Sequence, residues 1–447
     1  MNLSPRAFFI IAMICLLGVL EQWHTLAVPG LWMICALLLV VGLMYERWRL
    51  GRVKLRVEAL DRAPLRLGHA SEIKVLLHRA DASAADNPRM LHAELASGLP
   101  VQLLPEASQD PAWLSVNGRG IRADIPARGD VAVSFPIQPR ELGNFPWKTL
   151  YAEMRGPLGL ADWQQQVQFD DCITVVPQTL GEAGRAFGDV RGAAAVRNAG
   201  AGAELHYLRD YVRGDPLRSI DWKGTARRGK PVTRVHQEEQ HIEIVLVVDA
   251  GRTSRTRIGA LSQFGHFVNV CAQFAEMAIA DGDGIGLVIA ADQPLVTISP
   301  NPGRQTLRSI RSSLASVQPQ PVETDLLRAA LAVERIARRR SLVVLLTDLY
   351  SQSIDGRFGQ TLQLWRSHHL PFVVSLLDAD VMNTARQDAA GMEDVFRALA
   401  AREYMQTVRA NATAANRFGA RTLVTRPHDL ERRLLREYHT LKVRRLI

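Results

Sequence analysis

The chain has 447 residues, of which 47% are apolar, and it carries a formal net charge of +9. This length is too great for one hydrophobic core and predicts two or three domains, while the apolar content excludes a largely disordered chain. The positive charge favours an anionic partner only weakly, because it is spread along the whole sequence. The four cysteines form no CxxC pair, which argues against a zinc site and a disulfide scaffold.

Two apolar stretches open the sequence, and they predict a transmembrane helical hairpin within residues 1–50. The helices are expected at about 7–23 and 26–45, and the second is long enough to cross a hydrocarbon core of ~30 Å. A cleaved signal peptide is the alternative, but no small-x-small cleavage site follows the first stretch. Basic residues follow the second stretch and are absent between the two, so both termini and the soluble domains are predicted on the cytoplasmic side.

Residues 51–180 are predicted to form an all-β domain. Short segments rich in β-branched residues recur there, including SEIKVLLHR and VAVSFPIQP, with Gly, Pro, Asn and Asp between them. Helical periodicity is absent. The economical fold is an immunoglobulin-like sandwich, although the Cys–Trp–Cys signature of antibody domains is missing.

Residues 243–447 are predicted to form a doubly wound α/β domain. Apolar strands such as IEIVLVVDA and SLVVLLTDL alternate with amphipathic helical segments, among them the stretch from Met392 to Asn416. This alternation is typical of a mostly parallel sheet with right-handed crossovers.

Two predicted strands of this domain end in an acid, Asp249 and Asp348. Ligands of open α/β sheets bind beyond the carboxyl ends of the strands. Thr253 and Thr324 are expected near the same edge, so the four residues could supply oxygen ligands to Mg²⁺ or another hard cation. The alternative is that Asp249 caps the following turn and Asp348 binds local backbone.

This set resembles the von Willebrand factor A-like fold, whose metal site uses an Asp-x-Ser-x-Ser loop with a distant Thr and Asp. Here the loop reads Asp249-Ala250-Gly251-Arg252-Thr253. Gly251 brings no side-chain oxygen and Arg252 places a cation nearby, so any metal site is expected to be degenerate.

Residues 181–242 are predicted to hold a flexible Gly/Ala-rich linker (192–204) and a charged segment, YLRDYVRGDPLRSIDWKGTARRGKPVTR. An internal brace or a partner surface is the favoured interpretation, because paired Arg and Asp side chains can fix an irregular segment. A nucleic-acid patch is disfavoured by the acids Asp210, Asp215 and Asp221. A catalytic loop built on His206 lacks any accompanying nucleophile motif.

The charged segment resembles the signature of a bacterial family known as domain of unknown function fifty-eight. The resemblance rests on the order and spacing of nine residues in particular: Arg209, Asp210, Tyr211, Gly214, Asp215, Arg218, Asp221, Trp222 and Arg227. A second match, RELGNFPW…GPLGLADW…ITVVP, looks like the family's segment that closes the β domain.

The resemblance implies a membrane-anchored protein of the bacterial inner membrane with a hairpin, a β domain and a von Willebrand A-like domain. It also implies a MoxR-type AAA+ ATPase as partner and a role as a chaperone-like or assembly adaptor. No catalytic residue carries over from the family, and we therefore expect no enzyme. The alternative is a divalent-metal-dependent hydrolase that uses the acidic crevice of the A-like domain.

Overall fold

A computed structural model describes residues 2–23, 30–59, 63–79, 90–104, 121–126, 129–179, 199–237, 241–352, 356–386 and 391–444. The chain divides into two compact units, Met1–Val176 and Pro177–Ile447. The apolar stretches and the β segments lie in the first unit, and the α/β segments lie in the second.

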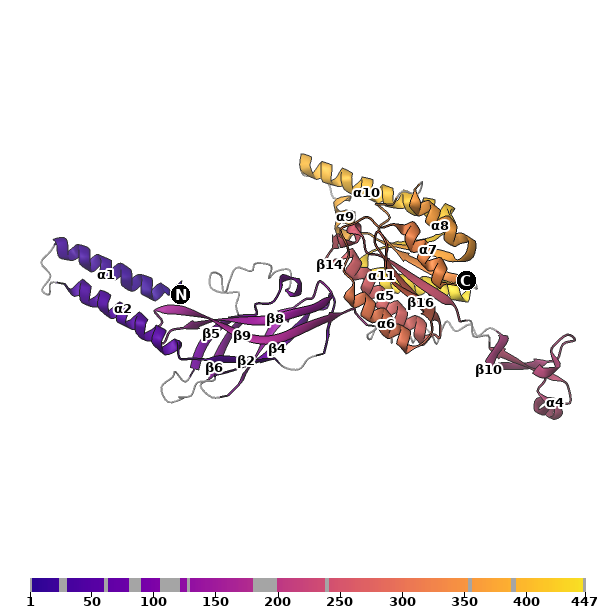
Figure 1. The fold of residues 1–447 in the computed structure, drawn as a ribbon, viewed down its shortest axis with the longest axis horizontal. Coiled ribbons are helices and arrows are strands. Elements are labelled where there is room, and N and C mark those ends of the chain that lie inside the picture. Colours follow the sequence, from indigo (N-terminus) through magenta and orange to yellow (C-terminus); the bar gives the residue numbers. More distant parts are fainter. Residues whose placement is uncertain are drawn as a thin grey trace. The chain divides into compact units, whose positions relative to one another are not determined.

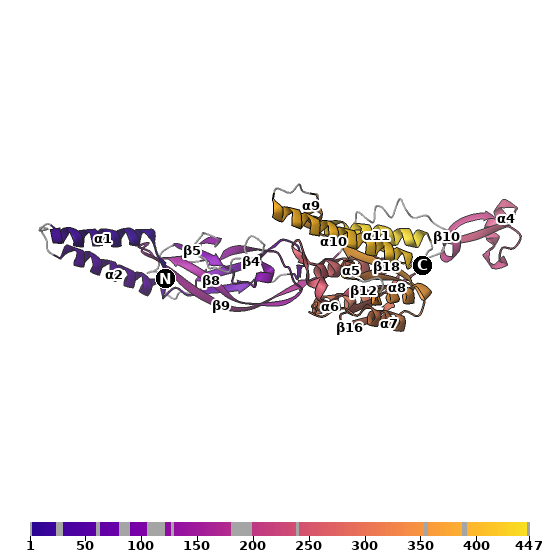
Figure 2. The same ribbon diagram turned by 90° about the horizontal axis from the view of Figure 1, so that it is seen from above.

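Two helices begin the first unit. Strand β1 (Asn2–Leu3) leads into α1 (Pro5–Trp23), which lies beside α2 (Leu31–Leu50) in both views (Figures 1 and 2). Among the described residues, only α2 is long and apolar enough to cross a membrane. The structure therefore supports one spanning candidate, and the two-span hairpin stays a prediction.

The rest of this unit consists of two β-sheets. One contains β2 (Leu55–Ala59), β4 (Ser71–Arg79) and β7 (Val131–Ile137), in the order β2-β4-β7. The other runs β1-β9-β8-β5-β6, with β3 also paired to β9; its strands are β3 (Leu65–Arg66), β5 (Met90–Ala96), β6 (Ile121–Pro126), β8 (Gly143–Arg155) and β9 (Ala161–Val176).

The core of the β unit lies between these sheets. Ile73, Val75 and Leu77 of β4 are buried while Lys74 between them is exposed, which is the alternation of a strand with one face in the core. Trp147 of β8 is fully buried, and its ring meets that of Phe135 on β7 edge to face, at 6.1 Å between centroids. The all-β prediction is confirmed, whereas the finer immunoglobulin-like class is not.

The charged segment forms an antiparallel pair of strands, β10 (Ala199–Asp210) and β11 (Val232–Gln237). A 3-10 turn, η3 (Leu217–Ser219), and a short helix, α4 (Trp222–Arg228), connect them. We call residues 208–234 the signature module. From Ala199 onward the predicted linker 192–204 is part of strand β10, and Ala199 and Gly200 pair with Gln237 and His236 of β11. The first part of the predicted linker lies outside the described residues.

The α/β domain is built on a six-stranded sheet in the order β16-β15-β12-β17-β18-β19, parallel except for the edge strand β16. The strands are β12 (Glu243–Asp249), β15 (Gly284–Ala290), β16 (Pro294–Asn301), β17 (Ser341–Leu346), β18 (Leu370–Leu376) and β19 (Arg421–Thr425). The predicted doubly wound architecture is confirmed.

Helices cover both faces of this sheet (Figures 1 and 2). One face packs on α7 (Leu326–Ile336), α8 (Arg357–His368) and α10 (Met392–Arg417), and the other on α5 (Gln263–Ala280), α6 (Arg304–Ser316) and α11 (Pro427–Val443). Shorter elements are η4 (Arg252–Arg255), β13 (Arg257–Ile258), β14 (Leu261–Ser262) and α9 (Ala379–Thr384). Because β12 lies between β15 and β17, the strand order reverses there, which is where such folds open a crevice.

Candidate functional site

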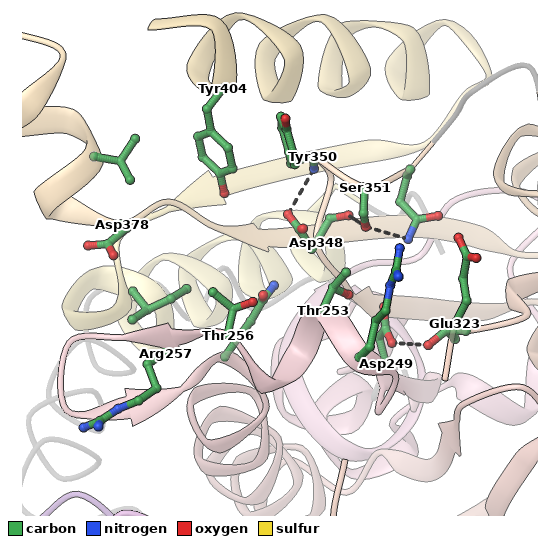
Figure 3. A pocket seen from close by; sticks show the side chains of 16 residues that line it. Asp249, Thr253, Thr256, Arg257, Glu323, Asp348, Tyr350, Ser351, Asp378 and Tyr404 are labelled. Atoms are coloured by element: carbon green, nitrogen blue, oxygen red, sulfur yellow. Dashed lines mark hydrogen bonds between the residues drawn. The ribbon is translucent and has the colours of Figure 1, made fainter. Parts of the chain in front are cut away.

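A crevice of about 530 Å³ opens at the carboxyl edge of the sheet, beyond β12, β17 and β18 (Figure 3). All four predicted ligands line it: Asp249, Thr253, Thr324 and Asp348. The structure therefore brings the four predicted residues together in one crevice. The side chains, however, are engaged with each other in a way that the prediction did not anticipate.

Asp249 is buried and fully partnered. One carboxylate oxygen accepts from the Gly251 amide at 2.9 Å and from the Thr324 hydroxyl, and the other accepts from the Thr347 hydroxyl at 2.6 Å. These donors offset the cost of burying a charge. The capping role that the sequence left open for Asp249 is the one that the structure contains.

The absence of a side chain at Gly251 allows the Thr324 hydroxyl to reach Asp249. A Cβ atom at position 251 would lie 2.1 Å from the Thr324 hydroxyl oxygen and 2.9 Å from the Val322 carbonyl oxygen. A serine therefore has no room here, and the Thr324 hydroxyl takes the space that it would need. Glycine is required by close packing rather than by its backbone angles.

The donor set does not fit the metal that the fold family implies. Thr324 donates directly to Asp249, Gly251 supplies no oxygen, and Arg252 lines the same crevice. Within the described residues, no group of three or more His, Cys, Asp or Glu side chains could hold a metal ion. We therefore derive no chemistry through a metal at Asp249, Thr253, Thr324 and Asp348, and no cofactor is established.

Asp348 lies on the other side of the crevice. One carboxylate oxygen accepts from the Tyr350 amide at 3.0 Å, as the local-backbone alternative predicted. Burial raises the pKa of Asp348, and the nearby Asp249 raises it further, while the hydrogen bonds from Tyr350 and Ser351 oppose the shift. This carboxyl is held in an environment that disfavours its charge.

Among the crevice residues that sequence reasoning missed are Asp378, Tyr350 and Tyr404. The rings of Tyr350 and Tyr404 lie 4.7 Å apart, and the Tyr404 hydroxyl points into the space between Asp348 and Asp378 (Figure 3). Burial raises the pKa of Tyr404, and the two carboxylates add to the effect. Asp378 follows β18 as Asp249 ends β12, so the same strand-end rule could have found it.

The signature module is braced from within by two of its acids. Asp215 accepts from Arg209 at 2.7 Å, from the Val212 amide at 3.1 Å and from Thr233 at 3.3 Å. Arg209 is the main cause that lowers the pKa of Asp215. These contacts tie the connecting loop to both strands, since Arg209 lies on β10 and Thr233 on β11.

The second brace joins Asp221 to β11. Arg234 donates to its carboxylate at 2.7 Å and lowers its pKa, and the Asp221 amide donates to the Val232 carbonyl at 2.8 Å. Gly224 follows so closely that a Cβ there would lie 2.9 Å from the Asp221 carboxylate. The brace interpretation thus accounts for Asp215 and Asp221.

The other predicted signature residues point outward or shape the turns. Trp222 is exposed, so it does not act as the buried anchor expected of a large aromatic residue, and Leu217 and Val212 are exposed beside it in the sequence. Gly214 has a φ of 113°, which only glycine adopts without strain. Asp210, Arg218 and Arg227 are exposed, and Tyr211 is partly buried.

Comparison with known proteins supports the resemblance. The family model described as "Protein of unknown function DUF58" matches residues 207–413, from the signature module to α10. Uncharacterized proteins of Mycobacterium tuberculosis and Mycobacterium bovis are each 26% identical over 198 residues, which are 42% of this chain. The chain spans 62% of the length of these curated relatives.

Several solved structures are similar at a lower level. The conserved hypothetical protein BatB from Bacteroides thetaiotaomicron has a TM-score of 0.26 at 13% identity, covering 30% of this chain and 66% of that one. A von Willebrand factor type A protein from Catenulispora acidiphila has a TM-score of 0.29 at 12% identity, covering 46% and 43%. The strand order, rather than these low scores, defines the α/β architecture. Over residues 207–413, which carry the signature module and the crevice, the chain matches the model of the DUF58 family.

Proposed function

We propose that this chain is a membrane-anchored adaptor that binds a protein partner through its α/β domain. In this proposal α1 and α2 form the anchor in the bacterial inner membrane, and the β unit and α/β domain lie in the cytoplasm. The partner class implied by the family resemblance is a MoxR-type AAA+ ATPase. The role is coupling rather than catalysis.

The observation that carries the proposal is an apolar stripe on α10. Its members recur at intervals of three and four residues and are 47–75% exposed: Met392, Val395, Phe396 and Leu399. Ala398 and Ala401 of the same helix are buried, so the stripe faces away from the domain. The first turns of α10 extend beyond the α/β layers (Figure 1).

An apolar stripe of this kind is what a partner protein covers. Scattered exposed apolar residues are ordinary, but four on one helical face form a contiguous patch. Phe and Met are enriched at the cores of protein interfaces. The crevice opens beside the middle of the same helix, where Tyr404 stands near Asp348 and Asp378.

The signature module offers a second contact surface. Val212, Leu217 and Trp222 are exposed on a frame that Asp215 and Asp221 hold rigid. Arg213, Arg218 and Lys223 surround them in the sequence and are also exposed. A rigid frame with exposed apolar and basic residues suits a docking surface, because little conformational entropy is lost on binding.

Site-specific photo-crosslinking tests the proposal. A benzophenone amino acid is placed at Phe396 in the full chain in its native membrane, and the matched control is Leu331, a 48% exposed residue on α7. We expect the MoxR-type ATPase in the Phe396 adducts and not in the Leu331 adducts. Adducts with that ATPase at both positions, or at neither, would contradict the assignment of α10 as the docking surface.

The rival function, a divalent-metal-dependent hydrolase, gains no support from the crevice residues. Its two proposed acids differ in their surroundings: Asp249 accepts three hydrogen bonds, and Asp348 lies where its charge is disfavoured. Neither is arranged as a ligand of a shared ion.

A further inference from the structure

We propose that the turn Gly156–Leu160 of the β unit enters the membrane interface beside α2, with the side chain of Leu158 in contact with lipid. This inference rests on the proposed membrane anchoring. It assigns a role to the GPLGL motif, which sequence analysis singled out and the crevice does not explain. The partner surface is the bilayer itself.

A buried carboxylate fixes this turn to α2. Glu46, in the last turns of α2, is fully buried and accepts three backbone N–H groups, from Leu158 at 2.9 Å, Leu160 at 3.1 Å and Ala161 at 3.1 Å. Gly156 permits the approach, because a Cβ there would lie within 2.3 Å of the carboxylate. Charge-assisted hydrogen bonds of this kind are stronger than neutral ones, so the turn is held firmly.

The start of α1 is attached to the same turn. The Ser4 hydroxyl donates to the Gly159 carbonyl at 2.6 Å, and the Ser4 amide donates to the Leu160 carbonyl at 2.9 Å. Strand β1 pairs with the first residues of β9, Ala161 and Asp162. Both helices are therefore fixed to one turn of the β unit, and that turn cannot move away from them without breaking these bonds.

The depth of the turn follows from its contacts along α2. A Cβ at Gly42 would lie 2.9 Å from a methyl carbon of Leu160 and 3.5 Å from one of Leu158. Gly42 precedes Arg47 by five residues, which is about 7.5 Å along a helix axis. Residues 31–45 are apolar, so both leucines lie beside the apolar part of α2, on the membrane side of its first basic residue.

Aromatic and basic side chains mark the level of the lipid headgroups. Arg47 lies over the Trp163 ring at 5.7 Å, Arg49 over Tyr45 at 5.7 Å and Arg52 over Trp48 at 3.7 Å. Trp, Tyr and Arg gather at membrane interfaces. Trp163 belongs to β9, directly after the turn, so the β unit meets this level at Trp163 and the turn reaches beyond it.

Leu158 is then exposed for a reason. Its side chain is 50% accessible although it neighbours α2, and it lies at the tip of the turn. A leucine side chain that stays exposed to water contributes no hydrophobic free energy. Apolar side chains inserted about 5–10 Å into the membrane interface, in contrast, strengthen membrane binding. The β unit would therefore contact the bilayer directly through this turn, in addition to its covalent connection to α2.

Depth-dependent fluorescence quenching tests this. The four native cysteines are replaced, a cysteine is introduced by Leu158→Cys in the full chain in liposomes, and it carries an environment-sensitive dye. Leu38→Cys, on the apolar part of α2, reports anchoring, and Leu331→Cys, with 48% exposure against 50% for Leu158, reports an aqueous site. Quenchers are a shallow lipid spin label and aqueous iodide.

We expect the Leu158 probe to be quenched by the spin label and several-fold less by iodide than the Leu331 probe. Iodide quenching equal to that at Leu331, with lipid quenching retained at Leu38, would overturn the inference and leave the anchor intact. Iodide access at Leu38 would overturn the anchoring itself. Adding Glu46→Gln, which removes the charge and one acceptor, should increase iodide quenching at Leu158, and no change would contradict the role of Glu46.

Discussion

Two buried carboxylates, Glu46 in the first unit and Asp249 in the second, are stabilised by different kinds of hydrogen-bond donor. Asp249 ends a strand and takes its donors from a glycine amide and two threonine hydroxyls of the α/β domain. Glu46 lies in the last turns of α2 and accepts hydrogen bonds from backbone N–H groups more than 110 residues away in the sequence. The Asp249 carboxylate links side chains that line the crevice, and the Glu46 carboxylate joins α2 to the turn before β9.

The difference shows what each site can do. At Asp249, the Thr324 hydroxyl donates directly to the carboxylate, so the site depends on the identity of particular side chains. At Glu46, backbone amides are the donors, so the junction depends on the shape of the turn and not on the identity of its side chains. Substitutions at the two sites should therefore fail in different ways.

The largest effect is expected for Glu46→Ala. The change leaves three backbone N–H groups without an acceptor, and each such buried group costs ~1–3 kcal/mol. We expect the β unit to lose about 3 kcal/mol or more of unfolding free energy, measured by denaturant titration in detergent. Glu72→Ala, at an exposed position on β4, is the control and should be near neutral. Equal stability of the two variants would show that the hydrogen bonds to Glu46 are dispensable.

Gly251→Ser should destabilise the α/β domain by about 1–3 kcal/mol, the usual cost of overpacking. The new Cβ would meet the Thr324 hydroxyl, so adding Thr324→Gly should recover part of the loss. Calorimetric titration with Mg²⁺ accompanies both variants and the native chain. Tight binding by the native chain that depends on Asp348 would contradict the closed crevice and revive the metal-dependent alternative.

Asp348→Asn should stabilise the α/β domain at neutral pH. The folded-state pKa of Asp348 is raised, mainly by burial, so its favourable contribution is complete below its unfolded pKa and is lost as the pH rises through the folded pKa. The variant should therefore have the higher urea midpoint at pH 7, and the difference should shrink as the pH falls through the raised folded pKa and level off below about 4, near the unfolded pKa. A lower midpoint at pH 7 would contradict the unfavourable environment of the charge.

The smallest effect is expected in the signature module. Asp215→Asn weakens the bond from Arg209, and we expect faster tryptic cleavage within residues 208–234, with little change in global stability. Because the pKa of Asp215 is lowered, its contribution is present above its unfolded pKa and is lost as the pH falls through the folded value. Asp210→Asn is the matched control, since Asp210 is exposed and Arg209 contacts its backbone carbonyl, which the substitution keeps. Identical cleavage of both variants would contradict the role of Asp215 in holding the signature module together.

The sequence was sufficient for the features that depend on periodicity. Strand alternation, the strand–helix rhythm and the acids after β12 and β17 placed the sheet and its crevice correctly. Asp378 follows the same rule after β18 but was overlooked, and Tyr404 reaches the crevice from a helix whose position no local pattern reveals.

Features that depend on distant partners could not be predicted. The pattern Asp-x-Gly-x-Thr shows that a ligand is missing, but only packing shows that Thr324 fills the gap. In the sequence Glu46 is a single acid followed by several arginines. Nothing in that pattern shows that the backbone N–H groups of Leu158, Leu160 and Ala161 donate to it. Trp222 illustrates a further limit, since the sequence does not show whether a large aromatic ring is buried, and the structure exposes this one.

The most direct test of the adaptor role is the affinity of the full chain, held in lipid nanodiscs, for the purified MoxR-type ATPase of its source organism. Phe396→Glu places a charge in the centre of the α10 stripe and should weaken binding by about tenfold or more, the effect expected of an interface hot spot. Leu331→Glu, at a similarly exposed position on α7, should bind as the native chain does. Binding that is unchanged by Phe396→Glu, or weakened equally by both, would contradict the proposal that this stripe receives the partner.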